Sequence, residues 1–529
     1  MSGHDLILRG GTVVLDGGPH ETDLAVSDGR ISAVEPEMEG TAAEEIEARG
    51  LYILPGAIDA HAHFNEPGRT DWEGFATGTR ALAAGGMTSY IEMPLNAYPP
   101  TCDAACFDEK VALAERSSLV DFAFYGGLVP GNLGHFDELA GRGVAGFKAF
   151  MSTTGTLDYA PADDLTLYEG MRKAAELRLP VLVHAENREI TDGLARRKVS
   201  TLKTTMRDYL DSRPVVAELE AIGRAILLAE ETGCALHVVH VSTGRGVALV
   251  AAARTRGVDV TCETCPHYLV LTDEDAEALG AVAKCAPPLR PREDLEDLWE
   301  QVGAGNVDFV ASDHSPCPPE MKAGQDMFRA WGGISGCQSL LNVMLDEAHH
   351  GRGLPLEKVA ALTAANVVER FRIPGKGNIK VGADADLALV DRSGMTTVRE
   401  GDLHYRHKTS PYVGRTFQGR IVRTIVRGTT VFRNGKVVSD PIGKLIRPRA
   451  RMPSGSDRRT QTRERWSRER REDNGGSLRV SGPLGAGAVP EDRRGLREAA
   501  ALPAEDHPRQ VERGSVLDPF GRLRLGRAL

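Results

Sequence analysis

The chain has 529 residues and a formal net charge of −10, with 41% hydrophobic and 26% charged residues. This length exceeds that of one ordinary domain, and the composition is that of a globular enzyme rather than a disordered, collagen-like or membrane-spanning chain. The eight Cys residues are too few for a disulfide scaffold, and the start MSGHDLILRGG lacks a signal-peptide pattern. We therefore expect the reducing cytoplasm as the location.

Charge is distributed unevenly along the chain. Residues 451–529 contain 17 Arg, no Lys and 12 acidic residues, a net charge of +5, which leaves −15 for residues 1–450. Such an acidic body has no electrostatic footprint for nucleic acid, and no apolar run is long enough to span a membrane. The charged, aperiodic stretch RRTQTRERWSRERRED predicts a disordered Arg-rich tail over 446–529. A solvated appendage is favoured over an RNA or membrane contact, and translation outside the original reading frame is a further alternative.

The first predicted element is a small β-sheet. Residues 5–50 contain short alternating segments separated by turns, DLILRGGTVVLDGG and DLAVSDGRISAVEP. A similar texture returns near the end in DADLALVD and GRIVRTIVRGTTVFRNGKVV. We expect residues 1–54 and 371–445 to pair into one composite β-domain, and two separate small sheets are the alternative.

The middle of the chain, residues 55–370, alternates short apolar runs with amphipathic stretches such as 217–233. The predicted strands are 53–63, 86–94, 121–129, 144–151, 180–187, 235–242, 259–269 and 307–315. Eight strand-then-helix units over about 300 residues predict an α/β fold of the (β/α)8 TIM-barrel type. An open doubly wound sheet would need a Gly-rich phosphate loop after its first strand, but HAHFNEPG follows instead.

Most of these strands end in residues that carry chemistry, and in a barrel such ends meet at one face. The residues are His61 and His63, Lys148, His184, His237 and His240, and Asp313. Residues two apart on a strand share a face, so His61 and His63 can grip one cation. His237 and His240 are three apart, so only one points inward, and His240 is nearer the carboxyl end. Singly, each residue is more often structural than a ligand; together they indicate a site.

Four imidazoles, one lysine and one aspartate suit two divalent metal ions. Imidazole binds zinc, cobalt, nickel or iron, and a carboxylate tolerates most of these ions. A neutral lysine bridges two ions poorly, whereas a lysine carbamate formed with carbon dioxide bridges them as a carboxylate does. A snorkelling Lys148 with its ammonium in water is the alternative.

These residues carry a family resemblance. PGAIDAHAH, Lys148, His184, HVVH and SDH resemble the cyclic amidohydrolases, which include dihydroorotases, hydantoinases or dihydropyrimidinases, and allantoinases. The phrases HFNEPGRTDWEGFATGTRA, IEMPLN, TCETCPHYL, SDHSPCPPEMKAG and YRHKTSPYVGR resemble the allantoinase branch, over about residues 5–445. The resemblance implies hydrolysis of the cyclic amide of allantoin to allantoate, with a hydantoinase or dihydropyrimidinase as the alternative. Relatives that have lost the metal serve as scaffold proteins, but they lack several of these residues.

The resemblance also implies roles for the site residues. His61 and His63 would bind one ion, His184 and His240 the other, and N6-carboxylated Lys148 would bridge them. Asp313 would ligate and act as the general base and then the general acid toward a metal-activated hydroxide. The ions would be zinc, with cobalt, nickel, manganese or iron as alternatives, and the protein would be a homotetramer without nucleic-acid or membrane partners.

Departures from the sibling families concern the substrate pocket. Dihydroorotases carry Arg where this chain has the neutral Asn65, and hydantoinases carry Tyr where it has Thr153. By resemblance, Asn65, Cys285 and Ser315 would contact the ureide, whereas one additional loop residue leaves the pocket role of Trp331 open.

Other polar groups have simpler interpretations. Cys262 and Cys265 are expected to be buried thiols because no second C-x-x-C exists. A ligand role for His267 is a minor alternative, and Glu92 is expected to order the barrel mouth or to pair locally.

Overall fold

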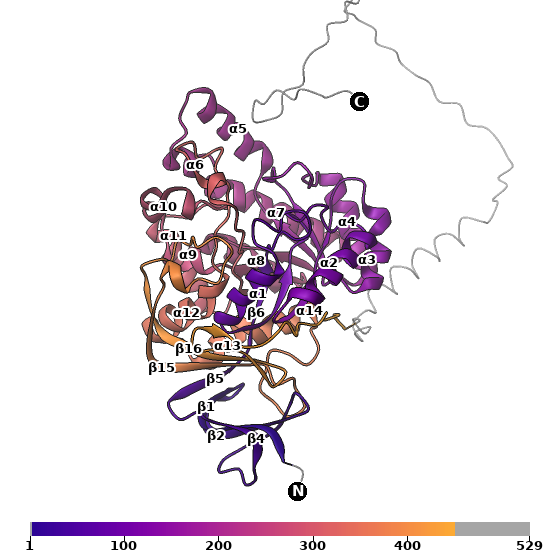
Figure 1. The fold of residues 1–529 in the computed structure, drawn as a ribbon. Coiled ribbons are helices and arrows are strands. Elements are labelled where there is room, and N and C mark those ends of the chain that lie inside the picture. Colours follow the sequence, from indigo (N-terminus) through magenta and orange to yellow (C-terminus); the bar gives the residue numbers. More distant parts are fainter. Residues whose placement is uncertain (1–2, 450–529) are drawn as a thin grey trace, which may run out of the picture. The chain divides into compact units, whose positions relative to one another are not determined.

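The computed structural model describes residues 3–449, and strands from both ends of this region form one sheet (Figure 1). Its strands are β1 (His4–Leu15), β2 (Gly18–Ser27), β3 (Arg30–Glu35), β4 (Ala42–Glu47), β5 (Leu51–Pro55), β15 (Leu387–Thr397), β16 (Thr416–Val426), β17 (Thr429–Arg433) and β18 (Lys436–Val437). The two halves meet where β5 runs antiparallel to β15. The prediction of one composite β-domain is therefore confirmed, and the alternative of two separate sheets is wrong.

Alternating side chains explain why this sheet has its own core. In β1, Leu6 and Leu8 are buried, and they pack with Leu24 of β2 and Leu387 of β15 in one apolar cluster. Residues two apart on a strand face the same side, so the alternation of the sequence places these groups together. Burial of apolar surface contributed by both ends of the described region stabilises the sheet.

Parallel strands form the barrel. They are β6 (Ala57–Ala62), β7 (Met87–Glu92), β8 (Asp121–Phe124), β9 (Gly126–Gly127), β10 (Phe147–Phe150), β11 (Val181–His184), β12 (Leu236–Val238), β13 (Val260–Thr264) and β14 (Phe309–Val310). β8 and β9 are two parts of one strand, separated only by Tyr125. The backbone N–H of His63 donates to the carbonyl of His314 at 2.8 Å and closes the last strand onto the first. The predicted eight-stranded barrel is confirmed.

Helices connect the strands and lie outside them (Figure 1). They are α1 (Phe75–Ala84), α2 (Ala104–Ser117), α3 (Phe136–Arg142), α4 (Asp164–Leu177), α5 (Arg188–Ser200), α6 (Met206–Asp211), α7 (Val215–Thr232), α8 (Gly244–Thr255), α9 (Pro266–Val270), α10 (Asp273–Leu279), α11 (Arg292–Gly303), α12 (Leu340–Val343), α13 (Leu356–Ala360) and α14 (Asn366–Phe371). Several begin at a side-chain cap: Asp103 accepts from the N–H of Cys106, and Asp163 from that of Thr166.

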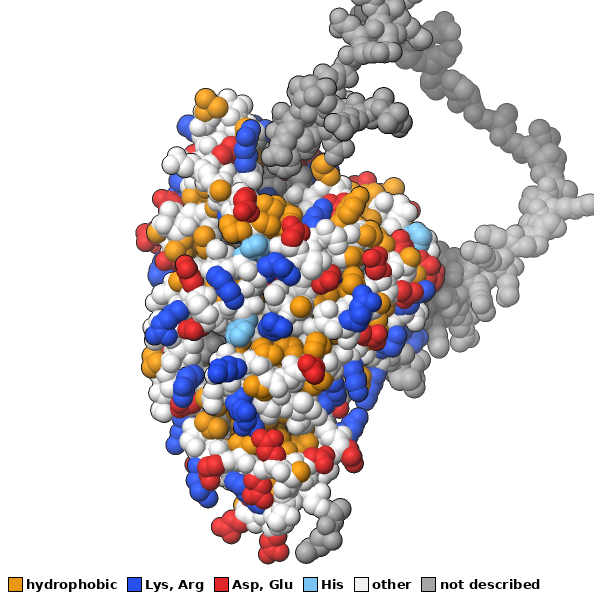
Figure 2. Space-filling model, viewed as in Figure 1, with side chains coloured by type: hydrophobic (Ala, Val, Ile, Leu, Met, Phe, Trp, Pro, Cys, Tyr) orange, Lys and Arg blue, Asp and Glu red, His pale blue; other side chains and the backbone are white. Residues whose placement is uncertain are grey.

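Short helical segments complete the list of elements. Single turns are η1 (Leu133–His135), η2 (Gly280–Ala283), η3 (Pro319–Lys322), η4 (Cys337–Ser339) and η7 (Glu400–Asp402), and wider turns form η5 (Met344–Gly351) and η6 (Ala361–Ala365). Within residues 3–449, none of the helices combines the length and apolar character needed to cross a bilayer. On the visible face, basic and acidic side chains are interspersed (Figure 2).

Two of the predicted strands are interrupted by a glycine or a proline. The segment 53–63 is divided at Gly56, with β5 in the composite sheet and β6 in the barrel. A Cβ at Gly56 would lie 2.2 Å from the side chain of Thr88, so only glycine fits at this crossing. The segment 259–269 is a strand only as far as Thr264, because Pro266 begins α9, where its fixed φ and missing N–H are favourable.

The last described residues run back along the barrel. The N–H of Ile446 donates to the carbonyl of Phe122 at 2.7 Å, and the N–H of Arg449 donates to that of Arg372 at 3.0 Å. Ile446 is buried, so these residues belong to the folded body. The rest of the predicted Arg-rich tail, residues 450–529, lies outside the described part of the chain.

Candidate metal centre

The six ligand-type side chains of the sequence analysis all lie at the carboxyl end of the barrel. His61 is in β6 and His63 directly follows that strand, whereas Lys148 is in β10 and His184 is the last residue of β11. His240 follows β12, and Asp313 follows β14. Because the strands are parallel and closed into a barrel, residues far apart in sequence meet at one mouth.

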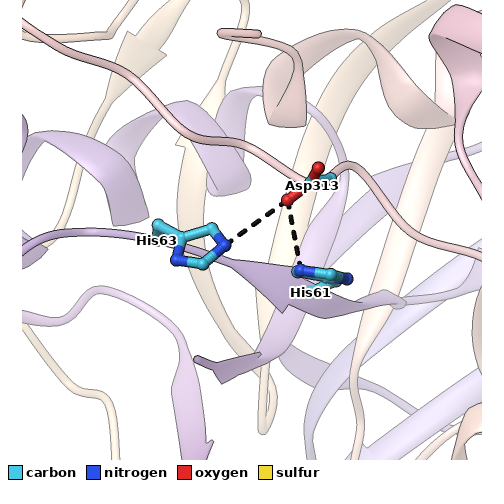
Figure 3. Close-up of side chains that lie close together, drawn as sticks. All are labelled: His61, His63 and Asp313. Atoms are coloured by element: carbon cyan, nitrogen blue, oxygen red, sulfur yellow. Dashed lines mark ion pairs between the residues drawn. The ribbon is translucent and has the colours of Figure 1, made fainter. Parts of the chain in front are cut away.

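Three of these side chains converge on one point (Figure 3). Oδ1 of Asp313 lies 3.1 Å from Nε2 of His61 and 3.4 Å from Nε2 of His63. Both imidazoles are buried, and the three ligand atoms lie within 4.8 Å of one another. Two imidazoles and a carboxylate at this spacing form a group able to hold a divalent ion.

A second pair of imidazoles lies beside the first. Nδ1 of His184 and Nε2 of His240 are 3.0 Å apart, and the ring of His240 is 5.5 Å from that of His61. Both rings are buried, and burial lowers the pKa of His184 as well as that of His240. The two rings are therefore neutral at pH 7, which is the form that binds a metal ion.

Lys148 is fully buried, and its amine has no hydrogen-bond partner. Nζ lies 5.1 Å from the ring centre of Phe150, which stacks on His184. Burial lowers the pKa of Lys148 to about 7, against the opposing effects of the Glu263 and Asp313 carboxylates. The snorkelling alternative is wrong, because this side chain does not reach water.

The protonation states of His61, His63 and Asp313 depend on one another. Burial opposes protonation of His61, but Asp313 and Glu263 outweigh it and raise the pKa of His61 to about 8. Burial dominates at His63 and lowers its pKa to about 4. For Asp313, burial is outweighed by the neighbouring imidazoles, which hold its pKa well below the ordinary value. The site thus contains an ionised carboxylate facing imidazoles, as a cation site requires.

Glu263 of β13 is a site residue that the sequence analysis missed. One of its carboxylate oxygens contacts Nδ1 of His61, and the other lies 3.1 Å from Nε2 of His237. The Glu263 carboxylate accepts the Nδ1 proton of His61 and orients the ring so that Nε2 faces Asp313, where a metal ion would take the place of the Nε2 proton. His237 therefore supports Glu263, while His240 lies beside His184. The sequence signal for this residue is a glutamate placed between the two cysteines of TCETC.

Glu186 plays the corresponding part for the second pair. It lies 2.9 Å from Nε2 of His184, and Arg213 contacts the same carboxylate oxygen. Burial would raise the pKa of Glu186, but Arg213 and His184 outweigh it and lower the pKa to about 2. This carboxylate directs Nδ1 of His184 toward His240. Arg213 contacts Glu186 only in the folded barrel, so no local sequence pattern predicts this contact.

Backbone strain marks two of the site residues. His240 has a φ of 41° and Asp313 a φ of 45°, in the left-handed region that non-glycine residues seldom occupy. Asp59 stabilises the second of these turns: its Oδ1 accepts from the N–H groups of Ser312, at 3.0 Å, and His61, at 3.2 Å. This contact joins the segment that carries Asp313 to the strand that carries His61.

The donor set fits divalent metal ions. Ring atoms of His63 and His240 and the amine of Lys148 are buried without hydrogen-bond partners, although unpaired polar groups of this kind cost about 1–3 kcal/mol each. Metal ligation compensates such a cost for nitrogen donors. The group of His61, His63 and Asp313 could hold one ion, and the pair of His184 and His240 lies beside it.

The predicted pocket residues have the following local contacts. Nδ2 of Asn65 donates to the carbonyl of Pro316 at 3.3 Å, while its Oδ1 is buried without a partner. Ser315 lies two residues beyond Asp313, and its Oγ is 3.4 Å from Nδ2 of Asn96. Cys285 is buried, and its carbonyl accepts from Tyr209 at 2.9 Å. The exposed Thr153 donates to Asp192, which is half-buried.

The residues with simpler interpretations behave as follows. Cys262 and Cys265 are buried free thiols, as expected. Glu92 pairs with Lys110 at 3.0 Å and accepts from the N–H of Phe64, so it orders the start of the loop after His63. His267 is buried against Tyr268, and within residues 3–449 it is in neither group of potential metal ligands.

Comparison with known proteins agrees with this geometry. The model of the amidohydrolase family matches residues 52–431, which is most of the chain. The chain therefore belongs to the amidohydrolases. The imidazoles, the buried lysine and the aspartate at its barrel mouth agree with this assignment.

The relatives narrow the assignment. The allantoinase of Rubrobacter xylanophilus is 72% identical over 448 residues, covering 85% of this chain and 98% of that protein. The allantoinase of Solibacter usitatus is 55% identical over 446 residues, 84% of this chain and 97% of that protein. Within the amidohydrolases the chain therefore falls in the allantoinase branch.

Among solved structures, the L-hydantoinase (dihydropyrimidinase) of Arthrobacter aurescens has a TM-score of 0.82 and 35% identity, covering 84% of this chain and 100% of that one. The dihydropyrimidinase of Brevibacillus agri has a TM-score of 0.79 and 30% identity, covering 85% of this chain and 99% of that one.

Proposed function

We propose that this protein is an allantoinase, which opens the five-membered ring of allantoin by hydrolysis of its cyclic amide to give allantoate. The observation that carries the proposal is the 72% identity to an allantoinase across nearly the whole of that relative. The buried cluster of ligand-type side chains at the barrel mouth supports the same chemistry.

We further propose that the site binds two divalent ions, zinc in the first place. His61 and His63 would hold one ion and His184 and His240 the other, with Asp313 as a further ligand. Lys148 would bridge them as a carbamate: its buried, unpartnered amine, with a pKa of about 7, is available to add carbon dioxide. Bound ions of this kind lower the pKa of a water from about 15.7 to near 7 and polarise the scissile carbonyl.

The proton transfers are assigned to Asp313. Its carboxylate is ionised at neutral pH and faces the point between His61 and His63. Asp313 takes the proton of the attacking water as the oxygen adds to the ring carbonyl. The same proton then goes to the departing ring nitrogen as the C–N bond breaks. The second proton of the water is released to solvent from the new carboxylic acid, so that the single ring-opened product carries a carboxylate and a neutral ureido group.

Substrate orientation is assigned to the loops around the mouth. The unpartnered Oδ1 of buried Asn65 can accept from an N–H of the ureide ring, and Asn65 adds no positive charge for a substrate carboxylate. Cys285 and Ser315 would line the remaining wall. A ring without a carboxylate, such as allantoin, is favoured over dihydroorotate on these grounds.

We also propose a homotetramer in the cytoplasm, with no nucleic-acid or membrane partner. The eight cysteines are all free thiols, in keeping with a reducing compartment.

The direct test measures ring opening by the purified, metal-loaded enzyme on allantoin, hydantoin, dihydrouracil and dihydroorotate. We expect kcat/KM for allantoin to exceed each of the others by at least about a hundredfold, since one hydrogen bond contributes about 0.5–1.5 kcal/mol, up to about tenfold, and several distinguish these rings. Equal or faster turnover of hydantoin or dihydrouracil would make the protein a hydantoinase or dihydropyrimidinase instead.

A further inference from the structure

Besides Lys148, two lysines near the barrel mouth have no carboxylate within 4.0 Å anywhere in the described part of the chain, residues 3–449. Lys284 is buried just before Cys285, and Lys322 ends η3 in the loop that follows Asp313. Burial lowers the pKa of Lys284 to about 7 and that of Lys322 to about 8, so Lys322 keeps its charge at neutral pH. A desolvated ammonium is costly, and its partners therefore indicate its role.

The partners of both ammonium groups are backbone carbonyls. Lys322 donates to the carbonyls of Ala281 at 2.7 Å, Gly333 at 2.7 Å and Trp331 at 3.2 Å. An ammonium has three N–H donors, and these three acceptors use all of them. Lys284 donates to the carbonyl of Ala330, in the same short segment. The two lysines thus fasten residues 330–333 from both sides.

This segment is hydrogen-bonded to the loop that follows Asp313. The indole N–H of Trp331 donates to the carbonyl of Ser315 at 3.2 Å, and the N–H of Ser315 donates to the carbonyl of Ile334 at 2.9 Å. Ser315 is two residues from Asp313. The N–H of Gly333 donates to the carbonyl of Lys284 at 2.8 Å, next to Cys285. Two of the three proposed pocket residues are therefore tied to the segment that the lysines fasten.

The space around the segment leaves little freedom for an alternative placement. A Cβ at Gly333 would lie 2.3 Å from the carbonyl oxygen of Ser315, and one at Gly155 would lie 2.9 Å from the indole of Trp331. Trp331 also packs edge-on against Trp72, with ring centres 4.8 Å apart. A small displacement of residues 330–333 therefore moves Trp331 and Ser315 together.

We propose that Lys322 is a positioning residue for the ring-opening reaction: its ammonium, bonded to three backbone carbonyls, holds Trp331 and Gly333 against Ser315 and thereby sets the wall that orients the substrate. This inference rests on the proposed function, because it assigns the wall to the cyclic ureide. Lys322 acts through these residues and does not itself touch the reacting atoms.

Lys322→Met tests the proposal, because methionine keeps the apolar stem and removes all three donors. We expect KM for allantoin to rise at least tenfold while kcat falls less than threefold, with metal content unchanged. Lys322→Arg, which keeps a charge and donors, should lie closer to the wild type. Lys436→Met is the matched control, since Lys436 is exposed on β18 of the composite sheet, and its kinetics should equal those of the wild type.

A double-mutant cycle separates positioning from a merely structural role. Trp331→Phe should also raise KM, and combining it with Lys322→Met should raise KM by less than the product of the two single effects. The proposal is overturned if the two KM effects multiply in the double mutant, if Lys322→Met has an unchanged KM, or if Lys322→Met loses bound metal. A purely structural role, in which Lys322→Met does not fold and Lys322→Arg restores the fold and with it a wild-type KM, would also overturn it. Failure of the wild type to hydrolyse allantoin would instead refute the proposed function.

Discussion

Replacement of Glu263 by Gln tests the support of the metal ligands. The carboxylate of Glu263 contacts Nδ1 of His61 and Nε2 of His237 in a fully buried setting. The carboxamide of glutamine has nearly the same size but no negative charge. Its NH₂ group replaces one of the two oxygens, so one imidazole N–H loses its acceptor. His61 then loses the acceptor that holds its Nδ1 proton and orients its Nε2 toward the metal position.

The expected magnitude follows from the bonds that are lost. A hydrogen bond to a charged group contributes about 1.5–3 kcal/mol, and one of the two contacts of Glu263 loses its acceptor in the amide. Since about 1.4 kcal/mol corresponds to a tenfold change in an equilibrium constant, metal affinity should fall by about 10- to 100-fold. Turnover at limiting metal should fall in parallel and recover when metal is supplied in excess.

Competition with a chelator measures this affinity, and Asp308→Asn provides the control. Asp308 is likewise a carboxylate with two partners, Arg254 and the backbone N–H of Cys262 at 2.8 Å, but it precedes β14 and lies at the opposite end of the barrel. The control should lose stability without losing metal affinity. If Glu263→Gln binds both ions as tightly as the wild type, the assignment of His61 and its support is refuted.

Four further predictions concern single changes. His61→Ala should lose one of two ions and all turnover, and full occupancy by metal analysis would count against the ligand assignment. Lys148→Ala should be inactive and partly restored by a short carboxylic acid in the assay buffer; no response to any such acid would weaken the carbamate. A chain ended at Arg449 should keep its melting temperature within about 2 °C and its activity, and a large loss of either would show that residues 450–529 contribute. Burial opposes the charge of Glu186, but Arg213 and His184 lower its pKa from 4.5 to about 2, so it stabilises the fold above pH 4.5 and this contribution is lost as the pH falls toward 2. Glu186→Gln should therefore show a shallower acid unfolding profile, and an unchanged profile would exclude this pair as its cause.

The sequence predicts the barrel because strand-then-helix alternation is a local pattern. It also predicts which strand ends carry chemistry, since His61, His184 and Asp313 directly terminate or follow apolar runs. The segment 259–269 shows the limit of this reasoning. Its apolar residues continue past Thr264, but Pro266 starts a helix and moves His267 out of the strand.

Contacts between distant residues could not be predicted in the same way. Glu263 meets His61 across 202 positions of sequence, and Lys322 finds its carbonyl partners in two separate loops. A carboxylate or ammonium within an apolar segment can be recognised as unusual in the sequence. Which residue it contacts depends on barrel closure and loop packing. The six-ligand assignment therefore stays a prediction, whereas the convergence of His61, His63 and Asp313 is a feature of the fold.

A crystal structure of the active, metal-loaded enzyme tests the central claim most directly, when it is refined at a resolution that distinguishes an amine from a carbamate. The account predicts two ions, one bound by His61 and His63 and the other by His184 and His240, with a carboxyl group on Nζ of Lys148 between them. A single ion, or an unmodified amine at Lys148 in fully active enzyme, would contradict it.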